Sequence, residues 1–210
     1  MVPIFVHSLE HYDSAPLEEA IRQQLNALLP DELAGKRIVL KPNLLMRRSP
    51  ERATTTHPEV VRAVVRALKE RGATDIVIAD SPGGPYTKGL LHGIYSESGM
   101  AAVAKEEGVC LNEDTSSVTV PSKDHHLVSS FTLIRPIAEA DLIINLVKLK
   151  THCMMGLSGA VKNLFGTIPG LAKPEFHMRF PDKNDFGDML LDLCSTVSPA
   201  VTLVLSLIHI

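Results

Sequence analysis

The sequence predicts an α/β fold: a mostly parallel sheet with helices on both of its faces. Short β-branched runs alternate with amphipathic stretches, which is the pattern of strand-helix-strand units around a buried sheet. Of the 210 residues, 45% are hydrophobic and 21% are charged, so the chain can bury a core of ordinary size. We expect one domain over residues 1–204, incomplete at its carboxyl end.

Strands and helices alternate regularly in the first half of the chain. The expected strands are 2–7, 37–40 and 75–79, and the expected helices are 17–29, 58–71 and 97–107. The helix at 58–71 has the strongest pattern, because Val60, Val64 and Leu68 fall on one apolar stripe. Thr56-His57-Pro58-Glu59 before it has the form of a capping box, and Gly72 ends it.

The second half is less regular. Weaker strands, peripheral or antiparallel, are expected at 109–111, 118–120 and 130–133, and a buried strand at 142–146. Helices at 157–165 and 185–196 and a strand at 201–204 complete the domain. The apolar residues 205–210 match one reading frame of a transposon-end adapter, so we expect a cloning-derived tail there; the alternative is a genuine terminal strand.

Composition argues against several classes of function. The formal net charge is -3 at pH 7, and no apolar run approaches the roughly 20 residues of a membrane helix. With 4% aromatic residues and no Trp, the chain has few side chains on which nucleic-acid bases could stack. Cys110, Cys153 and Cys194 lie far apart, which fits neither a disulfide framework nor a four-thiolate site. We expect a cytoplasmic protein without a membrane or nucleic-acid partner.

Polar residues gather where the predicted strands end. Ligands of open parallel sheets bind beyond the carboxyl ends of the strands, so we expect a crevice at that edge. The residues expected to bind a ligand there are Lys41, Asn43, Thr56, Ser81, Lys148, Lys150 and Thr151. Lysines grouped with hydroxyls suit a small anionic ligand or cofactor with a carboxylate or phosphate group. The alternative is that the lysines are solvated loop charges or pair with Asp80.

A glycine-containing segment adds Ser158, Lys162 and Asn163 to the expected ligand-binding residues. Small residues before a helix let backbone N–H groups approach an anion, and Lys162 lies one turn beyond Ser158. The segment is not the G-x-x-x-x-G-K-[ST] phosphate loop, and no G-x-G-x-x-G occurs in the chain. Gly156 and Gly159 could instead serve close helix packing.

His57, Asp80 and His152 are the candidate catalytic residues, as groups that could move protons at the crevice. If their loops converge, they could instead hold iron or zinc, although no metal ligand is assigned. Histidines at helix caps and strand ends also commonly bond only to the backbone. The sequence therefore does not decide between an enzyme and a binding domain.

A basic segment provides a non-enzymatic alternative. Residues 36–71 contain ten Lys or Arg and three Glu, which could bind RNA phosphates or an acidic partner protein. The segment contains no aromatic residue, and Arg62, Arg66 and Lys69 form the ordinary wet face of an amphipathic helix. We therefore favour the crevice.

Six ordered motifs together resemble one known family over residues 37–204. They are Lys41-Pro42-Asn43, Thr56-His57-Pro58, Ile78-Ala79-Asp80-Ser81-Pro82, Ala140-Asp141-Leu142-Ile143-Ile144-Asn145, Lys148-Leu149-Lys150-Thr151-His152 and Gly159-Ala160-Val161-Lys162-Asn163-Leu164-Phe165-Gly166. The set resembles the family of domain of unknown function 362, whose members often carry a ferredoxin-like segment with [4Fe-4S] clusters toward the carboxyl end.

The resemblance implies an uncharacterised iron-sulfur protein with an electron-transfer partner and a redox-related role. This chain has no C-x-x-C-x-x-C stretch for such a cluster. We therefore expect an amino-terminal fragment that binds no cofactor cluster itself, with [4Fe-4S] expected in a full-length relative. The alternative is a family member that naturally lacks the ferredoxin segment.

Overall fold

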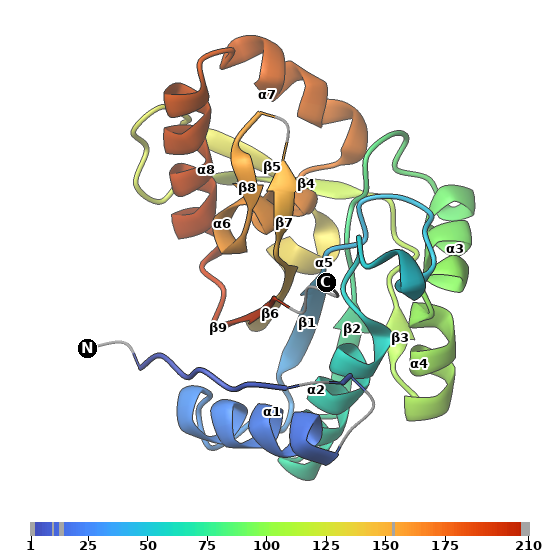
Figure 1. Ribbon diagram of the computed structural model, residues 1–210. Helices are drawn as coiled ribbons and strands as arrows, with labels where there is room; N and C mark the ends of the chain where they lie inside the picture. Colours follow the sequence, from blue (N-terminus) through green and yellow to red (C-terminus); the bar gives the residue numbers. More distant parts are fainter. Residues whose placement is uncertain (1–2, 10, 13–14, 153, 207–210) are drawn as a thin grey trace.

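The computed structural model describes residues 3–9, 11–12, 15–152 and 154–206. Its centre is a five-stranded sheet with the order β3-β2-β1-β6-β9 (Figure 1). These strands are β1 (Arg37–Pro42), β2 (Asp75–Ile78), β3 (Cys110–Leu111), β6 (Leu142–Lys148) and β9 (Val201–Leu205). Every neighbouring pair is parallel, which confirms the predicted fold class.

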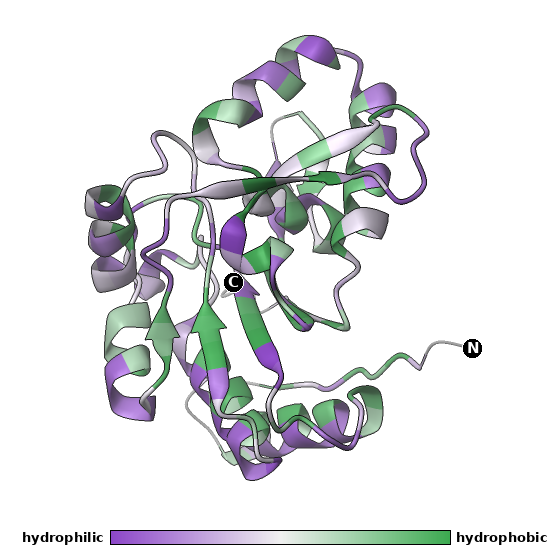
Figure 2. Cartoon of the chain, turned by 180° about the vertical axis from the view of Figure 1, so that it is seen from behind, coloured by the Kyte–Doolittle hydropathy of each residue, from purple (hydrophilic) through white to green (hydrophobic). Residues whose placement is uncertain are grey.

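Helices cover both faces of the sheet, as predicted. Successive strand residues point to opposite faces, so Ile38 and Leu40 enter one hydrophobic cluster and Val39 enters the other. The first cluster is covered by α1 (Ala15–Leu28), α2 (Pro58–Glu70), α3 (Lys88–Glu97) and α4 (Met100–Glu107). The second is covered by α5 (Arg135–Ala138), α8 (Lys183–Val197) and the antiparallel hairpin of β4 (Ser117–Pro121) and β5 (Ser130–Ile134). Figure 2 shows the central strands as predominantly hydrophobic.

Helix α2 confirms the predicted helix at 58–71, but its predicted capping box is wrong. The N-cap is His57, whose Nδ1 accepts a hydrogen bond from Glu59 N at 3.3 Å. The Thr56 hydroxyl instead accepts from Asn43 N at 2.8 Å and donates to Leu146 O at 2.7 Å. Thr56 is fully buried between two strand ends, so its hydroxyl satisfies backbone groups there rather than at the helix.

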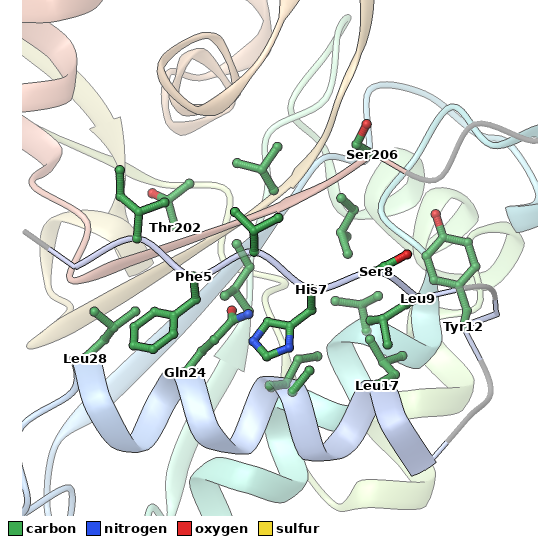
Figure 3. Close-up of a pocket in the computed structure, with 18 of the residues that line it drawn as sticks. Phe5, His7, Ser8, Leu9, Tyr12, Leu17, Gln24, Leu28, Thr202 and Ser206 are labelled. Carbon is green, nitrogen blue, oxygen red and sulfur yellow. The ribbon is translucent and has the colours of Figure 1, made fainter.

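The strand predicted at 2–7 is wrong for residues 3–7, and residue 2 lies outside the described residues. Residues 3–9 run over α1 beside β9 without strand pairing (Figure 3). A mainly apolar cavity of about 600 Å³ lies there, lined chiefly by residues 3–9, α1 and β9. Phe5 lies next to Leu28 in this cavity (Figure 3).

The helix predicted at 97–107 corresponds to α4, and the preceding helix α3 (Lys88–Glu97) was not predicted. Helix α3 ends at Glu97 and α4 begins at Met100. Between them Gly99 has φ 79, in the left-handed region that a glycine adopts without a Cβ clash. Helix α3 contains Gly89 and Gly93, and glycine in a helix interior weakens the helical signal of a sequence.

The segment after β6 differs most from expectation. Residues 157–158 belong to β8 (Gly156–Ser158), which pairs antiparallel with β7 (Lys150–His152), rather than to the predicted helix at 157–165. Only α6 (Ala160–Asn163) and the 3-10 turn η2 (Leu164–Thr167) are helical. Leu157 is 55% exposed, so the apolar spacing that suggested a helix does not reflect burial.

Several shorter elements complete the chain. They are the 3-10 turns η1 (Pro50–Arg52) and η3 (Gly170–Ala172) and the helix α7 (Lys173–Arg179). The strands predicted at 109–111, 118–120, 130–133 and 201–204 and the helix at 185–196 are present, with bounds shifted by a few residues. β3 is a parallel edge strand, and β4 and β5 are antiparallel. In the part of the chain that the structure describes, no helix is long and apolar enough to cross a membrane.

Candidate functional site

A cavity of about 660 Å³ lies beyond the carboxyl ends of β1, β2 and β6. Its walls come from the segments that follow these strands and from α6 and α7. Ten predicted site residues line it: Lys41, Asn43, Asp80, Ser81, Lys150, Thr151, His152, Ser158, Lys162 and Asn163. Polar segments that are distant in the sequence therefore meet at one edge of the sheet.

An ion pair forms the floor of this cavity. Lys41 Nζ lies 2.6 Å from Asp80 Oδ1, and the two side chains are 0% and 4% exposed. Lys41 also donates to Pro42 O at 2.9 Å, and Leu44 N donates to the second Asp80 oxygen at 2.9 Å. The pairing of Lys41 with Asp80 that the sequence left open is thus present. Because both oxygens of Asp80 are engaged, this carboxylate holds the floor together.

Gly166 closes over the ion pair. A Cβ at this position would overlap Asp80 Oδ1 and lie 2.6 Å from Lys41 Nζ. Ser81 N donates to Gly166 O at 2.8 Å, which fixes the glycine against the segment after β2. A glycine is required at this position because the Asp80 and Lys41 side chains approach it closely, not because of its backbone angles.

Two asparagines fix α6 against the sheet. Asn163 Nδ2 donates to Asn145 Oδ1 at 2.8 Å, and Asn145 Nδ2 donates to Ala160 O at 3.0 Å. Both side chains are buried, so these amide contacts replace water. The predicted ligand-binding residue Asn163 thus holds α6 in place at the cavity wall.

Lys150 lies on one side of the cavity. Its Nζ donates to Asn43 Oδ1 at 2.8 Å and to Thr54 O at 2.7 Å. Burial lowers the pKa of Lys150 to about 8; the Asp80 charge opposes this shift, and the cations Lys41 and Lys148 reinforce it. Both hydrogen-bond acceptors are neutral, so among the described residues no carboxylate contact offsets the cost of burying this cation.

Lys173 lies on another side, and the sequence did not single it out. Its Nζ donates to Ser81 O and to Pro82 O, the latter at 3.1 Å. Burial lowers the pKa of this amine to about 8 as well. Helix α7 reaches the cavity because Gly170 packs on residues 82–84; a Cβ there would overlap Gly84 O. The glycines at 83, 84 and 170 were the feature of the sequence that could have indicated this close contact.

Two histidines and a further lysine also line the cavity. His152 Nδ1 accepts from Met154 N and Met155 N, both at 3.2 Å, so its neutral ring carries the proton on Nε2. Burial, with Lys162 next in importance, lowers the pKa of His152 and of His177. His177, also missed in the sequence, stacks on Phe186 with ring centroids 4.6 Å apart.

Lys162 lies against aromatic side chains at the cavity wall. Its Nζ is 4.4 Å from the centroid of the Phe165 ring and 5.5 Å from that of Phe186. The negative face of an aromatic ring attracts a cation. This contact holds the Lys162 ammonium beside the cavity.

Three predicted site residues do not line the cavity. Thr56 bridges two strand ends, as described above. His57 stacks on Tyr12 with ring centroids 4.1 Å apart and interplanar angle 5°. Lys148 is 4% exposed, and its Nζ lies 3.3 Å from Tyr12 Oη. Tyr12 therefore contacts two residues that were expected at the crevice, His57 through its ring and Lys148 through its hydroxyl.

The residues do not fit a metal site. Among the described residues, no group of three or more His, Cys, Asp or Glu could hold a metal ion. Asp80 and His152 line the cavity but His57 does not, so the iron or zinc alternative finds no convergent ligand set.

A [4Fe-4S] cluster does not fit the described cysteines either. Such a cluster takes four thiolates. Cys110 is exposed on β3 and Cys194 is half-buried on α8, two separate elements. Cys153 lies outside the described residues. The described part of the chain therefore offers no four-thiolate site.

The basic side chains of α2 are occupied within the molecule. Arg62 Nε lies 2.9 Å from a Glu59 oxygen, and Arg66 Nε lies 2.9 Å from a Glu107 oxygen. Lys69 donates to the backbone oxygen of Glu107. These contacts compensate the positive charge on this helix face, so they give no support to RNA binding.

Two solved structures share the fold. The lactate racemase apoprotein from Thermoanaerobacterium thermosaccharolyticum superposes with a TM-score of 0.59 at 13% identity, over 90% of this chain and 49% of that one. A protein from Thermotoga maritima gives 0.52 at 16% identity, over 89% of this chain and 50% of that one. At these identities the likeness concerns the fold alone.

Sequence comparison identifies the family. The thylakoid-associated protein sll1697 of Synechocystis sp. is 33% identical over 173 residues, which cover 81% of this chain and 51% of that protein. The chain thus spans about half the length of the relatives it matches. The model of the family described as Domain of unknown function (DUF362) matches residues 38–208. The chain belongs to this family.

Proposed function

We propose that the cavity at the carboxyl edge of the sheet binds a small anionic ligand or cofactor with a carboxylate or phosphate group. One observation carries this proposal. Asp80, the one carboxylate among the described lining residues, is bound by Lys41, whereas Lys150 and Lys173 contact neutral oxygens. The cavity therefore holds more positive than negative charge.

The lowered lysine pKa values support the same proposal. Burial disfavours a charged amine, and a pKa of about 8 still leaves Lys150 and Lys173 mostly protonated at pH 7. An anion between them would offset the cost of burying both charges. Charge-assisted hydrogen bonds in a partly buried site are about twice as strong as neutral ones.

His152 is the residue we propose for a neutral contact or a proton transfer. Its Nδ1 is engaged by the backbone, so Nε2 is the atom left to donate a hydrogen bond. Its pKa is lowered, which favours the neutral ring at pH 7. A redox role with a [4Fe-4S] protein rests on the family resemblance alone, so our proposal is restricted to binding.

Thermal unfolding at constant ionic strength tests the proposal, with inorganic phosphate, acetate and succinate as probes. A ligand that binds only the folded state raises the melting temperature as its concentration exceeds the dissociation constant. We expect stabilisation of the wild type that Lys150→Met and Lys173→Met reduce and that the exposed-site control Lys105→Met keeps. Equal stabilisation of all four proteins, or none in the wild type, would contradict anion binding at this cavity.

A further inference from the structure

Two corners of the cavity have the same construction. In the first, which we call the Lys150 corner (Asn43, Thr54 and Lys150), the ammonium donates to two neutral oxygens at 2.8 and 2.7 Å. The Thr54 hydroxyl is buried beside it and has no hydrogen-bond partner among the described residues. An ammonium has three N–H donors, so one remains at this corner next to an unengaged hydroxyl.

The second, the Lys173 corner (Ser81, Pro82 and Lys173), repeats this arrangement. Lys173 donates to the backbone oxygens of Ser81 and Pro82. Ser81 is 1% exposed, and its hydroxyl lacks a partner within the described part of the chain. Buried hydroxyls normally find a partner, so an unengaged one in a cavity wall points to a ligand. Each corner thus combines an ammonium that has an N–H to spare with a buried hydroxyl that lacks a partner among the described residues.

The two corners lie at the ends of neighbouring strands. Lys150 Nζ bonds to Asn43, which follows β1, and Lys173 Nζ bonds to Ser81, which follows β2. Neighbouring strands are about 4.8 Å apart, so a ligand needs only a short spacer to place one acidic group at each corner.

Part of the cavity lining is suited to carbon atoms. Leu45, Phe165 and Pro174 line the same cavity as the two corners. The floor beneath is the neutral Lys41–Asp80 pair, which adds no net charge. A short apolar chain can therefore connect two acidic groups without burying a further charge.

We propose that the ligand is a dianion in which a short carbon chain joins two acidic groups, one bound at the Lys150 corner and one at the Lys173 corner. This inference rests on the proposed function and narrows its ligand class. Dicarboxylates and phospho-carboxylates share this chemistry.

Calorimetry on the intact chain tests the proposal at constant ionic strength. The probes are succinate and glutarate, the monoanion butyrate, 3-phosphonopropionate and inorganic phosphate. We expect at least one two-ended probe to bind ten-fold or more tightly than butyrate and phosphate, because only a two-ended probe reaches both corners. The ratio between the dicarboxylates and the phosphonate then identifies which acidic group the corners prefer.

Variants assign each end of the probe to a corner. Lys150→Met and Lys173→Met should each reduce the binding of the preferred dianion at least ten-fold, and Thr54→Val and Ser81→Ala about three-fold. Ser130→Ala and Lys105→Met, at exposed positions, should change it less than two-fold. Urea unfolding of each variant shows that it folds, and the comparison of probes on the wild type needs no variant.

The possible failures are distinguishable. If butyrate or phosphate binds as tightly as every dianion while both lysine variants weaken it, the cavity binds one anion, and the two-corner inference is overturned while the proposed function stands. If only one lysine variant affects the dianion, the second corner is not used. If no probe binds the wild type, both proposals fail.

Discussion

The floor of the cavity and its two corners hold buried lysines in opposite ways. On the floor, Lys41 is neutralised by Asp80 at 2.6 Å. At the corners, Lys150 and Lys173 donate to neutral oxygens in the part of the chain that the structure describes. The same residue type therefore has a structural role where the protein supplies its counter-charge, and it is the group that we propose for a ligand where its described partners are neutral oxygens.

The largest expected effect is on the floor. Asp80→Asn leaves the fully buried Lys41 ammonium without its counter-charge, and breaking a buried pair in this way costs about 3–5 kcal/mol of unfolding free energy. Urea denaturation measures the loss. Lys150→Met should not lower the stability, because it removes a cation that burial penalises. If Asp80→Asn were as stable as the wild type, the floor pair would not have the structural role assigned to it.

Gly166→Ala should have the next largest effect. The added methyl group would overlap Asp80 Oδ1 and crowd Lys41 Nζ, so the floor must shift. Overpacking of this kind costs about 1–3 kcal/mol of unfolding free energy. Gly159→Ala is the matched control, because its Cβ would meet only Leu149 Cδ1 at 3.8 Å. Equal stability of the two variants in urea would show that the Lys41–Asp80 pair can shift to accommodate the methyl group at little cost.

The pH dependence separates the corners from the floor. The pKa of Lys150 and of Lys173 is about 8 in the folded protein and 10.5 ordinarily, so the unfolded chain binds more protons between these values. The free energy of unfolding should therefore rise with pH through this window. Anion affinity should fall as pH rises above about 8, because the ligand prefers the charged amines. The fall should be up to about ten-fold per pH unit for each of the two lysines.

Calorimetry and urea unfolding between pH 7 and 9.5 follow these two opposite trends. The double variant Lys150→Met/Lys173→Met should flatten both of them. Affinity that stays constant across this range would mean that the bound anion does not depend on these two amines.

The sequence predicted the part of the site that the sheet determines. Lys41 lies at the carboxyl end of β1, Asp80 follows β2 and Lys150 follows β6. The parallel ends of these strands bring the three residues together. Lys173 and His177 could not be predicted in this way, because they lie on α7, whose place depends on the packing of Gly170 on residues 82–84. That contact joins distant segments and has no local periodicity.

The same limit applied to hydroxyl and imidazole groups. A capping pattern identifies which side chains can bond to a helix end but not which way they point. The Thr56 hydroxyl bonds to the backbone at the strand ends, and His57 is the N-cap of α2 instead. Which of the two residues caps the helix depends on the burial of Thr56 between two strands. That burial depends on tertiary contacts.

The smallest expected effect concerns a residue outside the cavity. His57→Ala removes the Nδ1 cap of α2 and the ring stacked on Tyr12, so the free energy of unfolding should fall by about 1 kcal/mol, as for the loss of other N-caps. Anion affinity should stay within two-fold of the wild type, since His57 does not line the cavity. A matched loss of affinity and stability in calorimetry and urea unfolding would extend the ligand site to the Tyr12 region, and the contrast between floor and corners would no longer describe the whole site.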